Sequence, residues 1–273
     1  MEVTFEWYVG REVPDPLLQE CSDLFGDHYG VWSEAAGERA GKRVRFPLHL
    51  VRKLLAGQDA RLAIARSEGA LVGYAASVQP TLPSVGTMSW VTQLVVHADY
   101  RKRGIARRLL FSIWAFSNHF AWGLVTSSPF TVRALEKATR RRVDPERIQA
   151  GIRTLLSGGT QVPYVKPSSE TICDATTARI NTDFPVDHSG LPEMIERVSS
   201  GSAWKLGELP EGWEWIAFTF RDQPQIALTA AEAQEMLEVA DASTSVAYTR
   251  MTMDDGHAWH KHTDLEAGFI WDN

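Results

Sequence analysis

The stretch "TQLVVHADYRKRGIARRLLFSIW", from Thr92 to Trp114, decides the fold. Strand formers run to Val96, a short polar turn follows, and Arg and Lys gather around Gly104 before a helical pattern begins. A strand that hands over to a helix exposes the first backbone N–H groups of the helix, which together with the helix dipole form a site for an anion. Gly104 lets the backbone approach that anion closely, and Ala106 is nearly as small. The sequence therefore predicts a diphosphate site at this turn.

The spacing of the turn differs from two common nucleotide motifs. It reads Arg101-x-x-Gly104-x-Ala106, which lacks the three glycines of a dinucleotide fingerprint and the Gly-Lys-Ser/Thr of a Walker loop. With the apolar ending Leu94-Val95-Val96 before it, the turn resembles the acetyl-CoA motif of the GNAT acyltransferase superfamily, Arg/Gln-x-x-Gly-x-Gly/Ala. "LVGYAASV" is similar to the third strand of that family, and "GLVTSSPFTVRALEKAT" resembles its later strand and helix. The resemblance covers about residues 3–142.

The resemblance implies a fold and a division of the chain. The fold is α/β (α+β), with a GNAT-like mixed central sheet flanked by helices. Residues 1–142 are expected to form the acetyl-CoA-binding domain. Residues 143–273, which resemble nothing we recognise, are expected to form a C-terminal α+β extension that helps to build the acceptor site or a dimer.

The resemblance also assigns residues to the cofactor. Backbone groups of Leu94 and Val96 would pair with the pantetheine arm, Arg101 and Arg103 would reach phosphate oxygens, and Ser128 would take the place of the family's Asn near the thioester. The implied cofactor-binding residues are Leu94, Val95, Val96, Arg101, Lys102, Arg103, Gly104, Ile105, Ala106, Arg107 and Ser128.

The sequence departs from the family where acid–base chemistry is expected. Many members carry a Tyr that protonates the leaving thiolate, and Leu135 stands at that position. Many carry a Glu on the central strand as general base, and the nearest residues here are Thr92 and Gln93, with His97 as a more remote candidate. An acceptor amine must lose a proton as it attacks. Either catalysis relies on positioning, or the acid and base come from the second half, or the domain does not turn over.

Composition indicates an ordinary globular protein. The chain has 273 residues, of which 44% are hydrophobic and 23% charged, and it has two cysteines without motif spacing. The first residues lack the features of a signal peptide, and no apolar run approaches the length of a membrane span. We therefore expect a cytoplasmic protein that binds no membrane.

The net charge of −6 is unevenly distributed. From Leu206 to the end there are 13 acidic residues against three basic ones. This balance makes nucleic acid a poor partner. The acidic segment can concentrate a cationic amine near the site, or it can simply keep the protein soluble.

Other clusters remain open to more than one reading. The segment "DDGHAWHKHTDLE" carries His257, His260 and His262 among carboxylates; it suits a metal, a base at the acceptor site or a solvated segment, and we assign it no metal. Tyr29 and Trp32 can contact the acceptor or belong to the core. The five C-terminal tryptophans, Trp204, Trp213, Trp215, Trp259 and Trp271, can form a binding wall or a core.

Periodicity predicts the order of elements. We expect strands at about 3–9, 60–66, 71–80, 89–96, 121–127, 214–220 and 244–252, and helices at about 14–32, 47–58, 105–116, 127–141, 144–156 and 229–240, with a turn at 67–70 between the second and third strands. Ser127 or Ser128 can cap the helix that begins at Pro129. Residues 81–88 are expected to be a loop, and residues 157–170 a linker or a long loop.

These observations favour an N-acyltransferase that moves an acetyl group from acetyl-CoA to a primary amine by direct transfer. A catalytically silent CoA-binding sensor or scaffold is the first alternative. The second is an interaction module that acts through the acidic, Trp-rich C-terminal half. The sequence leaves open whether the amine belongs to a small molecule or a protein, and whether the chain forms a homodimer.

Overall fold

The computed structural model describes residues 2–114, 117–166, 168–200 and 202–227, with Ala230 and Gln234. These residues build one nine-stranded sheet of order β1-β2-β3-β5-β6-β9-β8-β7, with β4 paired to β5. The strands are β1 Thr4–Val9, β2 Ala60–Ser67, β3 Ala70–Val78, β4 Thr81–Leu82, β5 Gly86–Val96, β6 Ala121–Thr126, β7 Thr171–Cys173, β8 Ala178–Asn181 and β9 Trp213–Phe220. Among these pairs only β5 and β6 run parallel. The predicted mixed sheet is confirmed.

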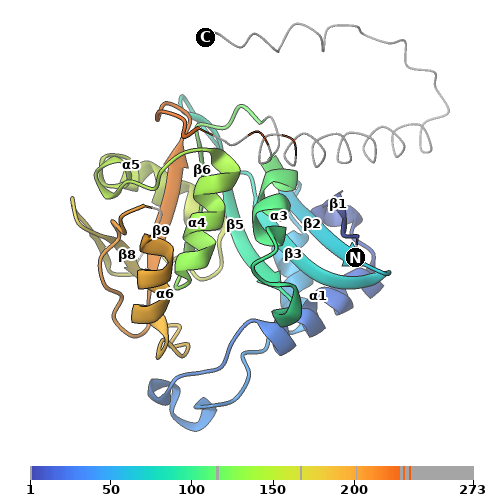
Figure 1. The fold of residues 1–273 in the computed structure, drawn as a ribbon. Helices are drawn as coiled ribbons and strands as arrows, with labels where there is room; N and C mark the ends of the chain where they lie inside the picture. Colours follow the sequence, from blue (N-terminus) through green and yellow to red (C-terminus); the bar gives the residue numbers. More distant parts are fainter. Residues whose placement is uncertain are drawn as a thin grey trace, which may run out of the picture.

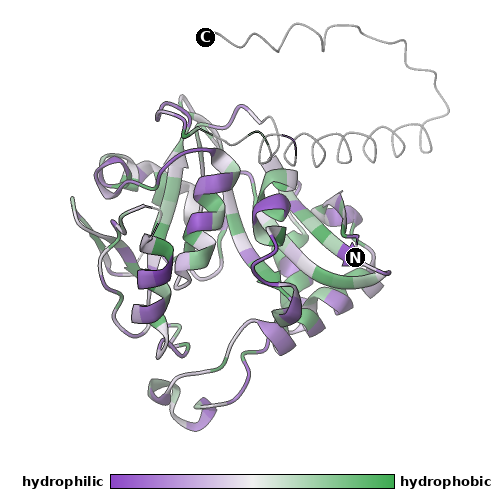
Figure 2. Cartoon of the chain, viewed as in Figure 1, coloured by the Kyte–Doolittle hydropathy of each residue, from purple (hydrophilic) through white to green (hydrophobic). Residues whose placement is uncertain are grey.

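Helices cover both faces of this sheet (Figure 1). They are α1 Asp15–His28, α2 Leu48–Leu55, α3 Ile105–Trp114, α4 Pro129–Thr139, α5 Pro145–Gly158 and α6 Leu191–Ser199. Short 3₁₀ turns lie at Gly10–Glu12, Glu34–Arg39, Ala98–Tyr100 and Gly159–Gln161. In Figure 1, α3, α4 and α6 lie in front of the sheet, and α1 lies behind it. Figure 2 shows the apolar residues concentrated on the strands and on the helix sides that face them.

Close backbone approach fixes two of these contacts. A side chain at Gly73 of β3 would meet Leu109 at 3.1 Å and Ile105 at 3.2 Å, so glycine allows α3 to lie tightly on the sheet. A side chain at Gly123 of β6 would meet the Phe218 ring at 2.3 Å. Glycine at this position therefore lets the aromatic side chain of β9 lie directly against β6.

The structure corrects the expectation for residues 81–88. They are not a loop, because Thr81 and Leu82 form β4, which pairs with the start of β5 at Thr87 and Gly86. The Thr81 and Thr87 hydroxyls are 2.9 Å apart, and Gly86 has a φ of +115° at the turn. A two-residue strand beside Pro and Gly is too short to show a period in the sequence.

Residues 157–170 are not a flexible linker. α5 continues to Gly158, a 3₁₀ turn follows, and Val162 and Val165 are buried. Gly159 lies against Trp90, since a side chain there would meet the indole at 2.9 Å. The Gly-rich composition therefore reflects close packing of the backbone on β5.

The sheet continues past residue 142. β9 pairs with β6 on one edge and with β8 on the other, and α6 packs on α4. β7, β8 and α6 were not placed by the sequence analysis. The expected helix at 229–240 and strand at 244–252 lie outside the described residues, as do the three clustered histidines, Trp259, Trp271 and most of the acidic segment.

Candidate functional site

The candidate site begins where β5 and β6 separate. Their parallel pairing ends at Val91 and Leu124, although β5 continues to Val96. Against β3 the register of β5 shifts between Val91 and Gln93, so Thr92 is the extra residue of a β-bulge. β6 turns to pair with β9 as far as Thr126 and Trp215. One edge of β5 from Thr92 to Val96 therefore has no strand partner among the described residues.

Backbone groups on that edge point into the opening. The N–H of His97 donates to Val72 O of the β3 side at 2.9 Å, and alternation along the strand directs the backbone groups of Leu94 and Val96 the other way, toward β6. Val96 O already accepts from Arg101 Nε at 3.1 Å, and Thr92 O accepts from the Tyr164 hydroxyl at 3.3 Å. The groups of Leu94 and the N–H of Val96 are thus placed to pair with an extended ligand.

The basic turn follows directly. Lys102 and Gly104 have φ of +64° and +78°, and α3 begins at Ile105 with no acidic residue in its first turn. Backbone N–H groups in such a turn converge on one point and bind anions. The sequence predicted the turn and the start of the helix, because Gly104 is the residue type that a positive φ favours.

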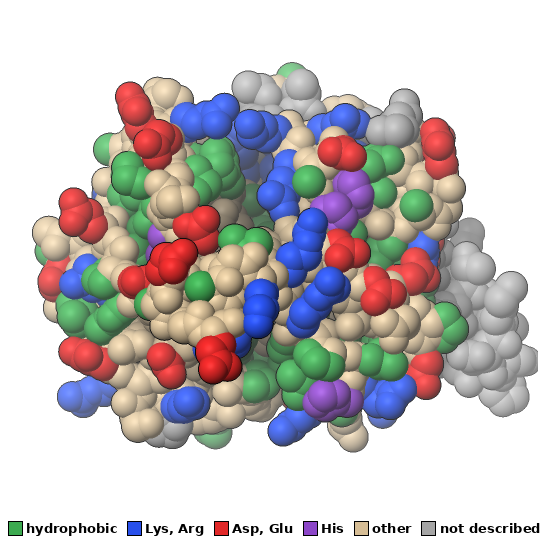
Figure 3. Space-filling view, turned by 90° about the horizontal axis from the view of Figure 1, so that it is seen from below, with side chains coloured by type: hydrophobic (Ala, Val, Ile, Leu, Met, Phe, Trp, Pro, Cys, Tyr) green, Lys and Arg blue, Asp and Glu red, His purple; other side chains and the backbone are tan. Residues whose placement is uncertain are grey.

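The cations of the turn differ in what they contact. Besides Val96 O, the Arg101 guanidinium donates to His28 O, so it joins the end of β5 to the end of α1. The Arg103 guanidinium lies 5.3 Å from the centre of the Tyr100 ring. Lys102 and Arg103 are exposed. Figure 3, which views the side on which α3 begins, shows Lys and Arg along the middle of this face with histidine beside them.

The second helix of the site begins at the same edge. Ser128 is the N-cap of α4, and its hydroxyl accepts from the N–H of Thr131 at 3.3 Å. Because β5 and β6 are parallel, α3 and α4 both begin at the carboxyl ends of their strands. A crevice at the carboxyl ends of diverging parallel strands is a common place for ligands.

The three residues considered as bases differ in environment. Thr92 is buried and donates to Ala76 O at 3.2 Å, and buried Gln93 accepts from the Tyr74 hydroxyl at 3.0 Å. His97 Nδ1 accepts from the N–H of Asp99 at 3.2 Å, and its ring lies 3.8 Å from that of His28. Desolvation and the neighbouring His97 lower the pKa of His28. Neither Thr92 nor Gln93 carries a group that accepts a proton at neutral pH.

Two further polar residues lie near the opening, and the sequence analysis missed both. Glu214 of β9 is only 6% exposed, and burial raises the pKa of its carboxyl to about 7, against a hydrogen bond from Thr182 that lowers it. Tyr164 reaches Thr92 O from the segment after α5, and burial, then the charge of Glu214, raises its pKa well above the usual value. The signal for Glu214 was a single carboxylate in the apolar strand "WEWIAFTF".

An aromatic group lies beside these residues. Phe184 contacts Trp32 and Tyr29, with ring centres 4.9 and 6.1 Å apart. Backbone hydrogen bonds hold the two chain segments together, since Ser33 N donates to Pro185 O at 3.0 Å and Asp187 N donates to Val31 O at 2.9 Å. The C-terminal half therefore adjoins the segment of Tyr29 and Trp32, for which the sequence left a contact with the acceptor or a place in the core open.

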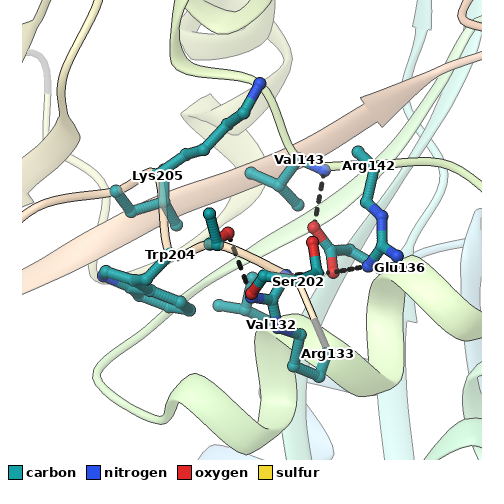
Figure 4. A pocket seen from close by; sticks show the side chains of 10 residues that line it. Val132, Arg133, Glu136, Arg142, Val143, Ser202, Trp204 and Lys205 are labelled. Carbon is teal, nitrogen blue, oxygen red and sulfur yellow. Dashed lines mark hydrogen bonds and ion pairs between the residues drawn. The ribbon is translucent and has the colours of Figure 1, made fainter. Parts of the chain in front are cut away.

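A separate pocket lies at the end of α4 (Figure 4). There Glu136 accepts from Arg133 at 2.6 Å, from Arg142 at 3.0 Å and from the N–H of Val143 at 3.0 Å. Arg133 also donates to the carbonyls of Ser202 and Ala203. These ion pairs satisfy Glu136, whose side chain is 3% exposed, and they fasten α4 to the chain before β9.

Comparison with known protein families gives a match to the middle of the chain. Residues 38–155 match the family model described as "Acetyltransferase (GNAT) domain". No curated protein matches the chain. Within the described residues no helix has the length and apolar character needed to cross a membrane.

Several solved structures show a partial likeness to this chain. A ribosomal-protein-alanine N-acetyltransferase from Brucella melitensis biovar Abortus 2308 is 27% identical, with 40% of this chain and 67% of that chain covered and a TM-score of 0.28. An aminoglycoside acetyltransferase from an uncultured soil metagenomic sample is 21% identical, covering 40% and 66%, with a TM-score of 0.30. Diaminobutyrate acetyltransferase from Paenibacillus lautus is 18% identical, covering 57% and 77%, with a TM-score of 0.32. At these TM-scores the neighbours do not define an acceptor for this chain.

Proposed function

We propose that this chain transfers an acetyl group from acetyl-CoA to a primary amine, because residues 38–155 match the family model of a GNAT acetyltransferase domain. The amine attacks the thioester directly while both substrates are bound. The observation that carries the proposal is the open edge of β5, from Thr92 to Val96, which leads into the basic turn at the start of α3.

The donor fits this edge in two parts. The backbone of Leu94 and the N–H of Val96 suit the amides of a pantetheine arm, which would add to β5 as an extra strand does. The N–H groups from Arg103 to Arg107 suit the pyrophosphate, with Lys102 and Arg103 contributing positive charge. Arg101 acts indirectly in this proposal, because it fixes Val96 O and the end of α1.

The acceptor would enter from the side of Tyr29, Trp32 and Phe184. The tetrahedral oxyanion would meet the Val96 N–H or a neighbouring donor. The amine class stays open between small molecules and proteins. The functional division at residue 142, a homodimer and a cytoplasmic location also remain predictions.

Thermal melting with acetyl-CoA tests the donor. A ligand that binds only the folded state stabilises it by RT ln(1 + [L]/Kd), roughly 2.7 kcal/mol at a hundredfold excess over Kd. We expect the melting temperature to rise with acetyl-CoA, and we expect Gly104→Glu to abolish the rise by placing a carboxylate where the phosphates bind.

The matched control is Gly69→Glu, in the turn between β2 and β3. Gly69 has a φ of +83°, close to the +78° of Gly104, so both variants carry similar backbone strain. A side chain at Gly69 meets nothing within 4 Å. This variant should melt lower yet keep the full acetyl-CoA shift. Loss of the shift in both variants, or no shift in the wild type, would contradict the donor site.

Thiol release with a panel of amines then separates an enzyme from a CoA-binding sensor. The sensor alternative draws support from Leu135, which is fully buried and offers no acid. Stabilisation by acetyl-CoA without amine-dependent thiol release would favour the sensor.

A further inference from the structure

We propose that Glu214 is the general base of the transfer and takes the proton that the acceptor amine loses as it attacks. This inference rests on the proposed function, and it supplies the base for which neither Thr92 nor Gln93 has the chemistry. Three observations support it: the sheet face on which Glu214 lies, its position in the register of β5, β6 and β9, and its neighbours Tyr164 and Tyr29.

The first ground is the face of the sheet. Side chains alternate along β9, so Glu214, Ile216 and Phe218 point to one side. Phe218 packs edge-on against Trp90 of β5, with ring centres 4.9 Å apart. Trp90 pairs with Val78 of β3, and Gln93 pairs with Ala76, two residues away on the same strand. Glu214 therefore shares a sheet face with Gln93, where the family resemblance places the base.

The second ground is the register across the opening. Val91 of β5 lies beside Leu124 of β6, and Leu124 lies beside Ala217 of β9. The pairing of β6 with β9 ends at Thr126 and Trp215. Glu214 directly precedes Trp215 on β9, so it lies one residue beyond the last pair with β6. It consequently lies at the level at which β5 has lost its partner, and not deep in the closed part of the sheet.

The third ground is a set of contacts that connects Glu214 to the opening. The Tyr164 hydroxyl donates to Thr92 O, on the bulge of β5. The charge of Glu214 acts on Tyr164 and on Tyr29, the residue that follows α1, and raises the pKa of both hydroxyls after the larger effect of burial. Tyr29 in turn packs beside Phe184. Glu214 is thus placed between the bulge of β5 and the aromatic group proposed for the acceptor.

The surroundings of Glu214 suit a proton acceptor near neutral pH. The neighbours of its carboxylate are the hydroxyls of Tyr29 and Tyr164, and Thr182 donates a hydrogen bond to it. Within the described residues no cation forms an ion pair with this carboxylate. Desolvation is the main cause of its raised pKa. A buried carboxyl that titrates near 7 accepts a proton readily and releases it readily, which general base catalysis requires.

The step balances without another reactant. A neutral amine attacks the thioester carbonyl carbon and forms the C–N bond, the C–S bond breaks, and the electron pair leaves with sulfur as the CoA thiolate. The amine loses one proton to the Glu214 carboxylate, and the thiolate takes up one proton to become the free thiol. The protonated carboxyl then releases its proton to solvent, which balances the proton that the thiolate takes up, so the enzyme ends as it began.

The test compares Glu214→Gln with wild type over a pH series. We expect the wild-type kcat to rise with pH through about 7, as the carboxyl ionises. Glu214→Gln should lower kcat roughly 10²–10⁴-fold and lose this pH limb, while the acetyl-CoA melting shift remains. Glu214→Asp, which keeps the carboxylate but shortens its reach, should recover part of kcat and the limb.

The matched control is Glu208→Gln. Glu208 precedes the same strand and is exposed, so the variant removes one negative charge from the same segment without touching the opening. It should retain wild-type kcat and pH dependence. A Glu214→Gln enzyme with unchanged kcat and pH profile, beside an active wild type, would overturn the inference alone. A wild type that binds acetyl-CoA but acetylates no amine would overturn the proposed function and the base with it.

Discussion

Glu214 lies between Trp213 and Trp215 in a strand whose other buried residues are apolar or neutral. Its carboxyl is withdrawn from water, and a buried carboxylate costs free energy unless it is paired. Leu135 shows the opposite case, because its full burial in α4 turns a position that often holds a catalytic residue into core. At the scale of single residues, burial decides which side chains have chemistry to offer.

The raised pKa of Glu214 predicts a pH-dependent stability. A group whose folded pKa lies above its unfolded value stabilises the fold below the unfolded pKa, and this stabilisation is lost as pH rises through the folded pKa. The stabilisation by Glu214 is therefore lost as the pH rises from about 4.5 to about 7. The shift corresponds to about 3 kcal/mol as an upper estimate.

Glu214→Gln removes this titration. Between pH 4.5 and pH 7 the wild type should lose free energy of unfolding that the variant does not lose, so the stability of the variant relative to wild type should rise with pH. Denaturant unfolding at pH 5 and pH 8 measures the difference. Glu208→Gln again serves as the control and should show no such trend. Parallel pH dependence of Glu214→Gln and wild type would mean that Glu214 titrates normally.

At the scale of elements, the site is made by two helices that begin at one edge of the sheet. α3 follows β5 through the basic turn, and α4 follows β6 through Ser128 and Pro129. The side chain of Ser128 satisfies one of the N–H groups that a helix leaves unpaired at its start, and proline takes a position where its missing N–H costs nothing. The sequence left Ser127 and Ser128 as alternative caps, and the structure selects Ser128.

Alanine variants of the two serines test this selection. Ser128→Ala should lower the free energy of unfolding by about 1 kcal/mol, because it removes the hydrogen bond to the N–H of Thr131. Ser127→Ala, one residue earlier, should change it by less than about 0.5 kcal/mol. Equal losses in chemical denaturation would show that the cap is shared or shifted.

At the scale of the whole molecule, β9 joins the two halves of the sequence. It is buried along most of its length, and it pairs with β6, inside the region that matches the acetyltransferase model, and with β8, beyond that region. The helix α5 covers β9 from the side of Phe220, and α6 packs on α4. Removing β9 would leave β6 as an edge strand with its apolar face uncovered, which favours aggregation.

Truncation tests this dependence. A chain that ends at Arg142 should be insoluble or lack cooperative melting, because β6 and α4 lose the strand and helices that cover them. A chain that ends at Ala227 keeps every contact named above, and we expect cooperative melting with the wild-type acetyl-CoA shift. A soluble, cooperatively melting fragment 1–142 that binds acetyl-CoA would show that the first half folds independently.

The sequence by itself determined the features that depend on local chemistry. The glycine turn, the start of α3 and the start of α4 after one of two serines follow from residue type and spacing. The mixed sheet followed from the resemblance of these segments to the acetyltransferase family, and the match of residues 38–155 to the acetyltransferase model agrees with it. Such features are read from neighbours along the chain, because propensity, capping and turn geometry act over a few residues.

Only the tertiary structure decided which distant residues meet at the site. The bulge at Thr92 belongs to the register of β5 against β3, and the Tyr164 hydroxyl reaches Thr92 O from 72 residues further along the chain. The burial of Glu214 likewise depends on what packs around β9. The sequence pattern of a single carboxylate in an apolar strand is the same whether its side chain is exposed to water or buried. Its pKa, and with it its proposed role, follows from desolvation by residues that no local pattern specifies.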